Sequence, residues 1–316
     1  MKTLAQILRT QTNLLLVFLA TVGISYAQQD AQYTQYMYNT VSVNPAYAGS
    51  RGHLSVAALY RAQWLGLDGA PETQTFNLHS PLGYNGLGGG ISVVNDVIGP
   101  TAETYIDFDI SYTIQLDFDK QLSFGLKPSA HLLNIDFNKL NQFQSGQDDL
   151  LQQNIDNKFS PNVGAGVYYH TDKFYAGLSV PRILETTHFE SSSLSTAKEE
   201  MNWYFISGYV WDLNPDLKFK PAVLSKMVRG APLQLDLSAN FMYSERFVGG
   251  VAYRWDAAVS AMAGFHVNEQ LMIAMAYDRE ITELGSTAFN NGSFELILRY
   301  DFIGGNRGTL KSPRFF

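Results

Sequence analysis

Residues 106–118 read Ile-Asp-Phe-Asp-Ile-Ser-Tyr-Thr-Ile-Gln-Leu-Asp-Phe, and this stretch decides the fold. Every second residue from Ile106 to Phe118 is apolar, and the residues between them are polar. Successive side chains on a strand point to opposite faces, so this period of two predicts a long β-strand with one apolar and one polar face. The same alternation returns in residues 233–243 and 293–302.

Alternation of this kind divides most of the chain into strands. The pattern predicts fourteen of them, an even number that returns the chain to its starting side. Their expected bounds are 53–64, 72–81, 87–97, 102–117, 121–136, 160–171, 173–181, 203–213, 217–225, 232–243, 246–256, 258–268, 270–280 and 291–302.

The connections between these strands sort by length. Even-numbered connections are tight turns such as 118–120 and 214–216, whereas odd-numbered ones are mostly longer, notably 137–159, 182–202 and 281–290. Short periplasmic turns and long extracellular loops are typical of bacterial outer-membrane barrels. We therefore predict an all-β transmembrane barrel of about 14 antiparallel strands; a soluble multi-sheet β protein is the alternative.

Composition agrees with a barrel. Of the 316 residues, 16% are charged and 13% are aromatic, against about 25% charged residues in a typical soluble domain. The net charge of −7 argues against nucleic acid as a partner. The sequence has no cysteine, so a lipoprotein anchor, a disulfide and thiol chemistry are all excluded.

The first 27 residues resemble an export signal. Lys2 and Arg9 precede the apolar run 14–20, and the small residues of 25–27 suit a signal peptidase. We expect a signal peptide at 1–27 and a mature protein in the bacterial outer membrane; an N-terminal membrane anchor is the alternative, although the run is short for a span.

The next segment, 28–52, does not alternate. It is rich in aromatic residues and contains a turn signal at Asn44-Pro45. A disordered leader would be polar and poor in aromatic residues, so we expect either a plug inside the barrel or a periplasmic docking element, with a plain extension on a sheet edge as the alternative. The residues expected to make its contacts are Tyr36, Tyr38, Asn44, Pro45, Ala46, Tyr47, Ala48 and Gly49. The barrel is expected at 53–302 and a periplasmic tail at 303–316.

Charged residues are also expected on the inner face of the barrel. The negative set is Asp107, Asp109, Asp236, Asp256, Glu295 and Asp301, and the positive set is Arg61, Lys127, Arg254 and Arg299. These charges would form ion pairs with a plug, or else line a water channel. Small residues in 86–90 suggest close approach of another backbone inside the barrel.

No pattern of catalytic or metal-binding residues emerges. His79 and Ser80 are neighbours on one strand and so point to opposite faces, which prevents them from acting as base and nucleophile. None of the six histidines has the spacing of a metal site. We expect no catalytic residue, no metal and no cofactor.

The runs at 32–39 and 44–49, the second reading Asn-Pro-Ala-Tyr-Ala-Gly, resemble the mature N-terminus of the PorP/SprF family of outer-membrane proteins. The ending at 311–316 is also similar to that family. The resemblance implies a non-enzymatic component of the type IX secretion and gliding-motility apparatus. In that role it would support secretion or surface anchoring of cargo such as large adhesins, and associate with periplasmic peptidoglycan-linked and ring proteins. A transporter or channel for hydrophobic small molecules is the alternative.

Overall fold

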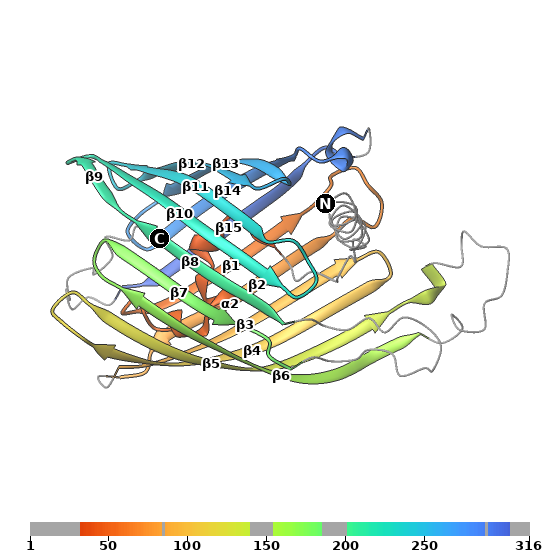
Figure 1. Cartoon of the computed structure of the whole chain (residues 1–316), viewed down its shortest axis with the longest axis horizontal. Coiled ribbons are helices and arrows are strands. Elements are labelled where there is room, and N and C mark those ends of the chain that lie inside the picture. Colours follow the sequence, from red (N-terminus) through yellow and green to blue (C-terminus); the bar gives the residue numbers. More distant parts are fainter. Residues whose placement is uncertain (1–31, 84–85, 140–153, 185–200, 288–289, 304–316) are drawn as a thin grey trace, which may run out of the picture.

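The wall of the protein is one antiparallel sheet that closes on itself. The computed structural model describes residues 32–83, 86–139, 154–184, 201–287 and 290–303. Strands that follow one another in the chain pair in the sheet, with one interruption. The last strand pairs with the first, from Leu54 opposite Phe302 to Ala62 opposite Phe294. Figure 1 shows the strands running obliquely around this closed wall, with the orange-red N-terminal segment inside it.

The described strands follow one another with few interruptions. They are β1 (Leu54–Ala62), β2 (Glu72–Pro81), β3 (Leu87–Ile98), β4 (Thr101–Gln115), β5 (Gln121–Ile135), β6 (Ile155–His170), β7 (Phe174–Val180), β8 (Asn202–Tyr209), β9 (Trp211–Asn214), β10 (Leu217–Val228), β11 (Gln234–Tyr243), β12 (Phe247–Arg254), β13 (Ala258–His266), β14 (Leu271–Glu280) and β15 (Ser293–Phe302). Short helical turns are η1 (Tyr36–Tyr38), α2 (Thr40–Val43), η2 (Pro45–Tyr47), η3 (Phe137–Lys139) and η5 (Glu283–Ser286).

The predicted fourteen-stranded barrel is confirmed, with one strand interrupted. Both β8 and β9 pair with β10, so together they fill one position in the wall. The interruption falls at Val210, which is buried and donates its backbone N–H to Lys173 O at 2.8 Å. Beyond Val210 the alternation ends, because all four residues of β9 are exposed.

One strand is longer than the sequence pattern predicts. β6 begins at Ile155 rather than 160. Asn157 takes a positive φ of 49° and donates its backbone N–H to Asn134 Oδ1 at 2.8 Å, which continues the contact with β5 across a register shift. The loop predicted at 137–159 is therefore shorter. Its centre, 140–153, lies outside the described residues, as do 185–200, the predicted signal peptide and the tail from 304 onward.

The two faces of the wall have opposite character, as the alternation predicts. On β4, Phe108 and Ile110 are 47% and 53% exposed on the outside, whereas Asp109 is 1% exposed on the inside. Aromatic side chains are also exposed on the outer face of many strands, including Phe76, Tyr112, Trp203, Trp211, Phe247, Tyr253, Trp255 and Tyr300. An apolar exterior with many aromatic residues suits contact with lipid.

One residue expected inside the barrel lies elsewhere. Asp256 follows the end of β12 at Arg254, takes a positive φ of 52° and is exposed in the turn before β13. The alternation stops two residues earlier than the pattern predicts, because the chain reverses there. The other inward charges predicted from the sequence are on the inner side of the wall, including Arg254, which pairs with Asp236.

Candidate functional site

Residues 32–52, the inner segment, lie inside the barrel. Asn44 ends α2 and begins η2, where its side-chain Oδ1 accepts the backbone N–H of Ala46 at 3.0 Å. Pro45 occupies the first position of η2, where a missing N–H is harmless. Gly49 has a φ of 74°, which favours glycine. The turn predicted at Asn44-Pro45 is confirmed.

The inner segment forms the hydrophobic core of the molecule together with the inner wall. Tyr36, Tyr38 and Ala46 are buried, and their cluster includes Leu59 of β1 and Ile206 of β8. The core of this protein therefore lies in the space that a channel would occupy.

The start of the inner segment is held by a buried charge cluster. Glu295 on β15 accepts the backbone N–H of Thr34 at 2.9 Å and of Gln35 at 2.8 Å. Arg61 on β1 pairs with Glu295 at 3.1 Å and with Asp278 on β14 at 2.7 Å. The Thr34 hydroxyl donates to Asp278 at 2.6 Å. Two carboxylates thus pair with one guanidinium and accept backbone N–H groups, which offsets the cost of burying these charges.

The middle of the segment is held from the opposite side of the barrel. Lys127 on β5 donates to Val41 O at 3.2 Å and pairs with Asp109 at 3.0 Å. Ser179 on β7 donates its hydroxyl to Val43 O at 2.7 Å. Lys127 therefore connects the inner segment to the acidic face of β4.

A row of strand glycines receives η2. A Cβ atom placed on Gly125 of β5 would lie 2.2 Å from Ala46 N, and one on Gly166 of β6 would lie 2.2 Å from Asn44 Oδ1. A Cβ on Gly88 of β3 would lie 2.4 Å from Ala48 O. Real Cβ atoms do not approach other atoms so closely, so the inner segment fits only because these three positions have no side chain. We call Gly88, Gly125 and Gly166 the glycine groove.

The end of the segment is fixed near the short turns. The backbone N–H of Gly49 donates to His79 Nδ1 at 3.2 Å, and Ser111 donates its hydroxyl to Ala48 O at 2.7 Å. The Arg51 guanidinium makes two hydrogen bonds to Asp301 on β15, at 2.9 and 3.2 Å. The inner segment is thus attached to the last strand, β15, near both of its ends.

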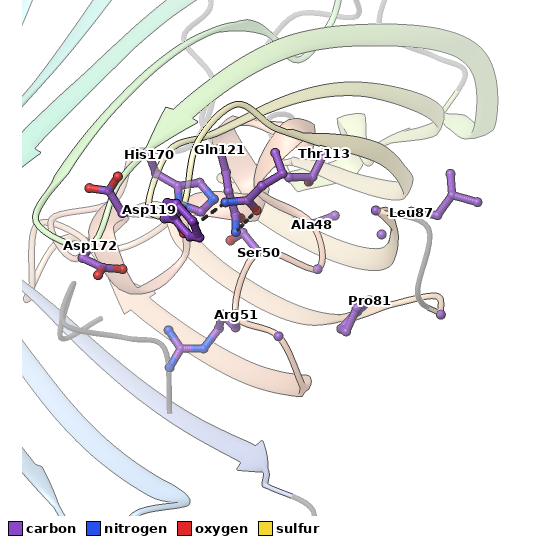
Figure 2. A pocket seen from close by; sticks show the side chains of 17 residues that line it. Ala48, Ser50, Arg51, Pro81, Leu87, Thr113, Asp119, Gln121, His170 and Asp172 are labelled. Carbon is purple, nitrogen blue, oxygen red and sulfur yellow. Dashed lines mark hydrogen bonds between the residues drawn. The ribbon is translucent and has the colours of Figure 1, made fainter. Parts of the chain in front are cut away.

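A cavity of about 410 Å³ lies below this end, among the turns that join β2 to β3, β4 to β5 and β6 to β7. Figure 2 shows Asp119 and Asp172 on one side of the cavity and Leu87 on the other, with Ser50 between them. These turns are the short connections, so the cavity is at the periplasmic end.

Every site residue named from the sequence lies in the inner segment, and all of them are buried or nearly so. The close approach expected at residues 86–90 is confirmed at Gly88. Sequence reasoning did not single out Gly125 and Gly166 or the contacts of Arg61. The available signal was a glycine at an inward position of an otherwise regular strand.

The side chains that could act in catalysis or bind a metal do not gather at one place in the described residues. His79 faces inward toward Gly49, while Ser80 lies on the other face of β2. Within the described ranges, no three histidine or acidic side chains gather in a metal-binding arrangement. Among the same residues, no helix is both long and apolar enough to cross a bilayer.

A closed fourteen-position antiparallel barrel with an apolar exterior and an occupied interior defines an integral protein of the bacterial outer membrane. The sequence profile of the type IX secretion system membrane proteins PorP/SprF matches residues 25–300. The chain belongs to this family.

Solved outer-membrane proteins resemble the structure. The toluene transporter TbuX of Ralstonia pickettii is 10% identical, with a TM-score of 0.49 over 82% of this chain and 91% of that one. Omp33 of Acinetobacter baumannii is 7% identical, with a TM-score of 0.46 over 79% and 98%. A FadL homologue of Pseudomonas aeruginosa is 13% identical, with a TM-score of 0.43 over 79% and 89%. No curated protein sequence matches significantly.

Proposed function

We propose that this chain is a non-enzymatic outer-membrane component of type IX secretion, which supports secretion or surface anchoring of cargo such as large adhesins. Membership in the PorP/SprF family supports the secretion role. The inner segment acts as a plug, so the barrel serves as a platform rather than as the conduit for cargo. The observation that carries this proposal is the burial of the inner segment between opposite sides of the wall.

The contacts of the inner segment favour a plug over a docking element. Glu295 and Lys127 hold it from opposite walls, and η2 lies in the glycine groove. Ordering a backbone costs about 1–2 kcal/mol per residue, which a segment recovers only through such burial and hydrogen bonding. A partner could not reach Tyr36 or Tyr47 without first extracting the segment.

Partners on the periplasmic side therefore bind elsewhere. The short turns that join β9 to β10, β11 to β12 and β13 to β14 are exposed at that end. We propose that periplasmic peptidoglycan-linked and ring proteins contact this surface, while cargo is handled on the extracellular side.

The first testable prediction is that deletion of residues 29–43 raises conductance. The deletion removes the contacts to Glu295 and Lys127 and leaves a lumen lined by charged side chains. Single-channel recording in planar bilayers should detect frequent openings in the variant and few in the intact protein. Heat-modifiable migration on a gel checks that the barrel still folds.

A synthetic peptide of residues 28–52 provides the control. The peptide should restore low conductance to the deletion variant, whereas a scrambled peptide should not. If conductance is unchanged while co-purification of periplasmic components and cargo export are both lost, the segment is a docking element and the plug is wrong. If cargo export persists in a strain with the whole chain deleted, the secretion role is wrong.

A further inference from the structure

The outer face of the barrel has a cleft of about 340 Å³ over β15, β1, β2 and β3, which we call the outer cleft. It is centred on Ala58 of β1, whose outward side chain is a single methyl group. The register of the sheet places Leu298 of β15 and Phe76 of β2 on either side of Ala58. Two large side chains therefore flank a small one, and the depression between them faces lipid.

The polarity of the outer cleft changes along the strands toward the extracellular end. Around Phe76 the outward side chains are apolar. Two residues nearer the extracellular end, Gln74 pairs across the sheet with Tyr60 and Asn95, and all three line the cleft. Glu72, beyond the cleft, is exposed. The cleft thus passes from apolar to polar in the direction in which a bilayer passes from hydrocarbon to headgroups.

The polar end of the outer cleft has unused hydrogen-bonding groups. Among the described residues, the Gln74 side-chain amide has no hydrogen-bond partner. Asn95 accepts the Thr104 hydroxyl through Oδ1 at 3.0 Å, while its Nδ2 group has no acceptor within the same part of the chain. Amides that face a bilayer need a polar partner from outside the protein. A ligand that fits the cleft therefore combines an apolar chain with hydrogen-bonding groups.

We propose that the outer cleft is a lipid-binding site. One acyl chain of a lipid in the extracellular leaflet lies over Ala58, and the polar linkage of the same lipid binds Gln74 and Asn95. Lipid is the occupant because the cleft is continuous with the apolar exterior of the barrel, which contacts the bilayer. A carboxamide both donates and accepts hydrogen bonds, so it suits the carbonyl and hydroxyl groups of a lipid linkage. This assignment goes beyond the secretion role and does not depend on it.

A photoreactive lipid tests the proposal. The probe is phosphatidylethanolamine with a diazirine midway along one acyl chain, present in trace amounts in vesicles that contain the folded protein. After illumination, peptide mass spectrometry compares adducts on Phe76 and Leu298 with adducts on Val251, which is 57% exposed on the outer face of β12, outside the cleft. We expect several-fold more adduct in the cleft, and equal labelling at the three residues would overturn the proposal.

Variants test each half of the site. Ala58→Trp fills the outer cleft and should lower its labelling several-fold, and unchanged labelling would contradict the lipid site. Ala261→Trp is the matched control, because Ala261 also faces outward near the extracellular end of its strand but does not line the cleft. Gln74→Leu combined with Asn95→Leu should also reduce labelling, because the linkage loses its partners. Full labelling of this double variant would overturn the polar half of the proposal. Heat-modifiable migration checks that each variant folds.

A second copy of the chain is the competing occupant of the outer cleft. The sequence contains no cysteine, so Phe76→Cys and Val251→Cys each give a protein with one thiol. If lipid fills the cleft, oxidation in vesicles should form disulfide-linked dimers no faster with Phe76→Cys than with Val251→Cys. Faster dimer formation with Phe76→Cys would assign the cleft to a second copy and overturn the lipid site.

Discussion

At the scale of single residues, the packing of the inner segment depends on strand positions that are glycines and so have no side chain. The glycine groove gives η2 a surface that approaches its backbone directly, and Asn44 uses this proximity to donate its side-chain amide to Val167 O at 3.1 Å. The Asn-Pro-Ala-Tyr-Ala-Gly run is therefore complementary to three strands that are distant in the sequence.

Gly125→Ala should weaken this fit. The added methyl would overlap Ala46 N and Pro45 C, and overpacking of this kind costs about 1–3 kcal/mol. Urea unfolding in lipid vesicles, followed by tryptophan fluorescence, should show this loss. Gly249→Ala is the matched control: its Cβ would meet only Met262 O at 3.9 Å, so its effect should stay within about 0.5 kcal/mol. Equal losses at both sites would contradict the groove.

Glu295→Gln should be more costly. It removes the charge opposite Arg61 and weakens the acceptor of Thr34 N–H and Gln35 N–H, all in a buried site. Breaking a buried pair costs about 3–5 kcal/mol, and the remaining Asp278 should keep the loss near 3 kcal/mol.

Glu245→Gln serves as the comparison in the same unfolding assay. Glu245 pairs with Lys218 in a turn and its side chain is 76% exposed, so the loss should stay below about 1 kcal/mol. A similar loss for the two glutamates would mean that the buried cluster does not hold the segment.

At the scale of the strand, one face of the strand is turned toward lipid and the other toward the inner segment. On β4, Ile110 faces outward, while Ser111 faces inward and contacts Ala48. A substitution on the outer side therefore reports on the membrane, whereas one on the inner side reports on the inner segment.

Arginine at Ile110 should cost about 2–4 kcal/mol, the value expected near the bilayer midplane. Leu116→Arg lies on the same outward face, six residues nearer the turn, and should cost only about 0–1 kcal/mol because the side chain reaches the interface. Folding equilibria in vesicles measure both. A larger cost at Leu116 would show that the barrel sits in the bilayer at another depth.

Strand existence was predictable here, because alternation is a local property of the sequence. The break at Val210 and the early start at Ile155 were not, since each depends on a hydrogen bond to another strand, from Val210 to Lys173 and from Asn157 to Asn134. The aromatic content of residues 28–52 predicted an ordered segment, but left open whether it lies inside the barrel, docks a periplasmic partner or extends along a sheet edge. The glycine groove that receives it was not predictable, because the register of distant strands decides which glycines meet Asn44 and Ala46.

At the scale of the whole molecule, the alternation of short and long connections fixes the direction of insertion. The sequence predicts that loops 137–159 and 182–202 are extracellular. On intact cells, a membrane-impermeant maleimide should label Ser145→Cys and Asp68→Cys, the latter in the exposed connection between β1 and β2. Ser244→Cys, in the turn between β11 and β12, should react only after permeabilisation. The opposite labelling pattern would show that the barrel is inserted in the opposite direction.

The charge cluster around Arg61 can be completed only after the last strand has joined the sheet. Arg61 belongs to the first strand and Glu295 to the last, and these two strands meet to close the wall. Thr34 and Gln35 precede the first strand in the chain, yet their acceptor on Glu295 belongs to the last. An unfinished barrel therefore lacks the acceptor for Thr34 and Gln35, and the start of the inner segment is held only once β15 is in place. The bound start of the inner segment is in this sense a sign that the barrel has closed.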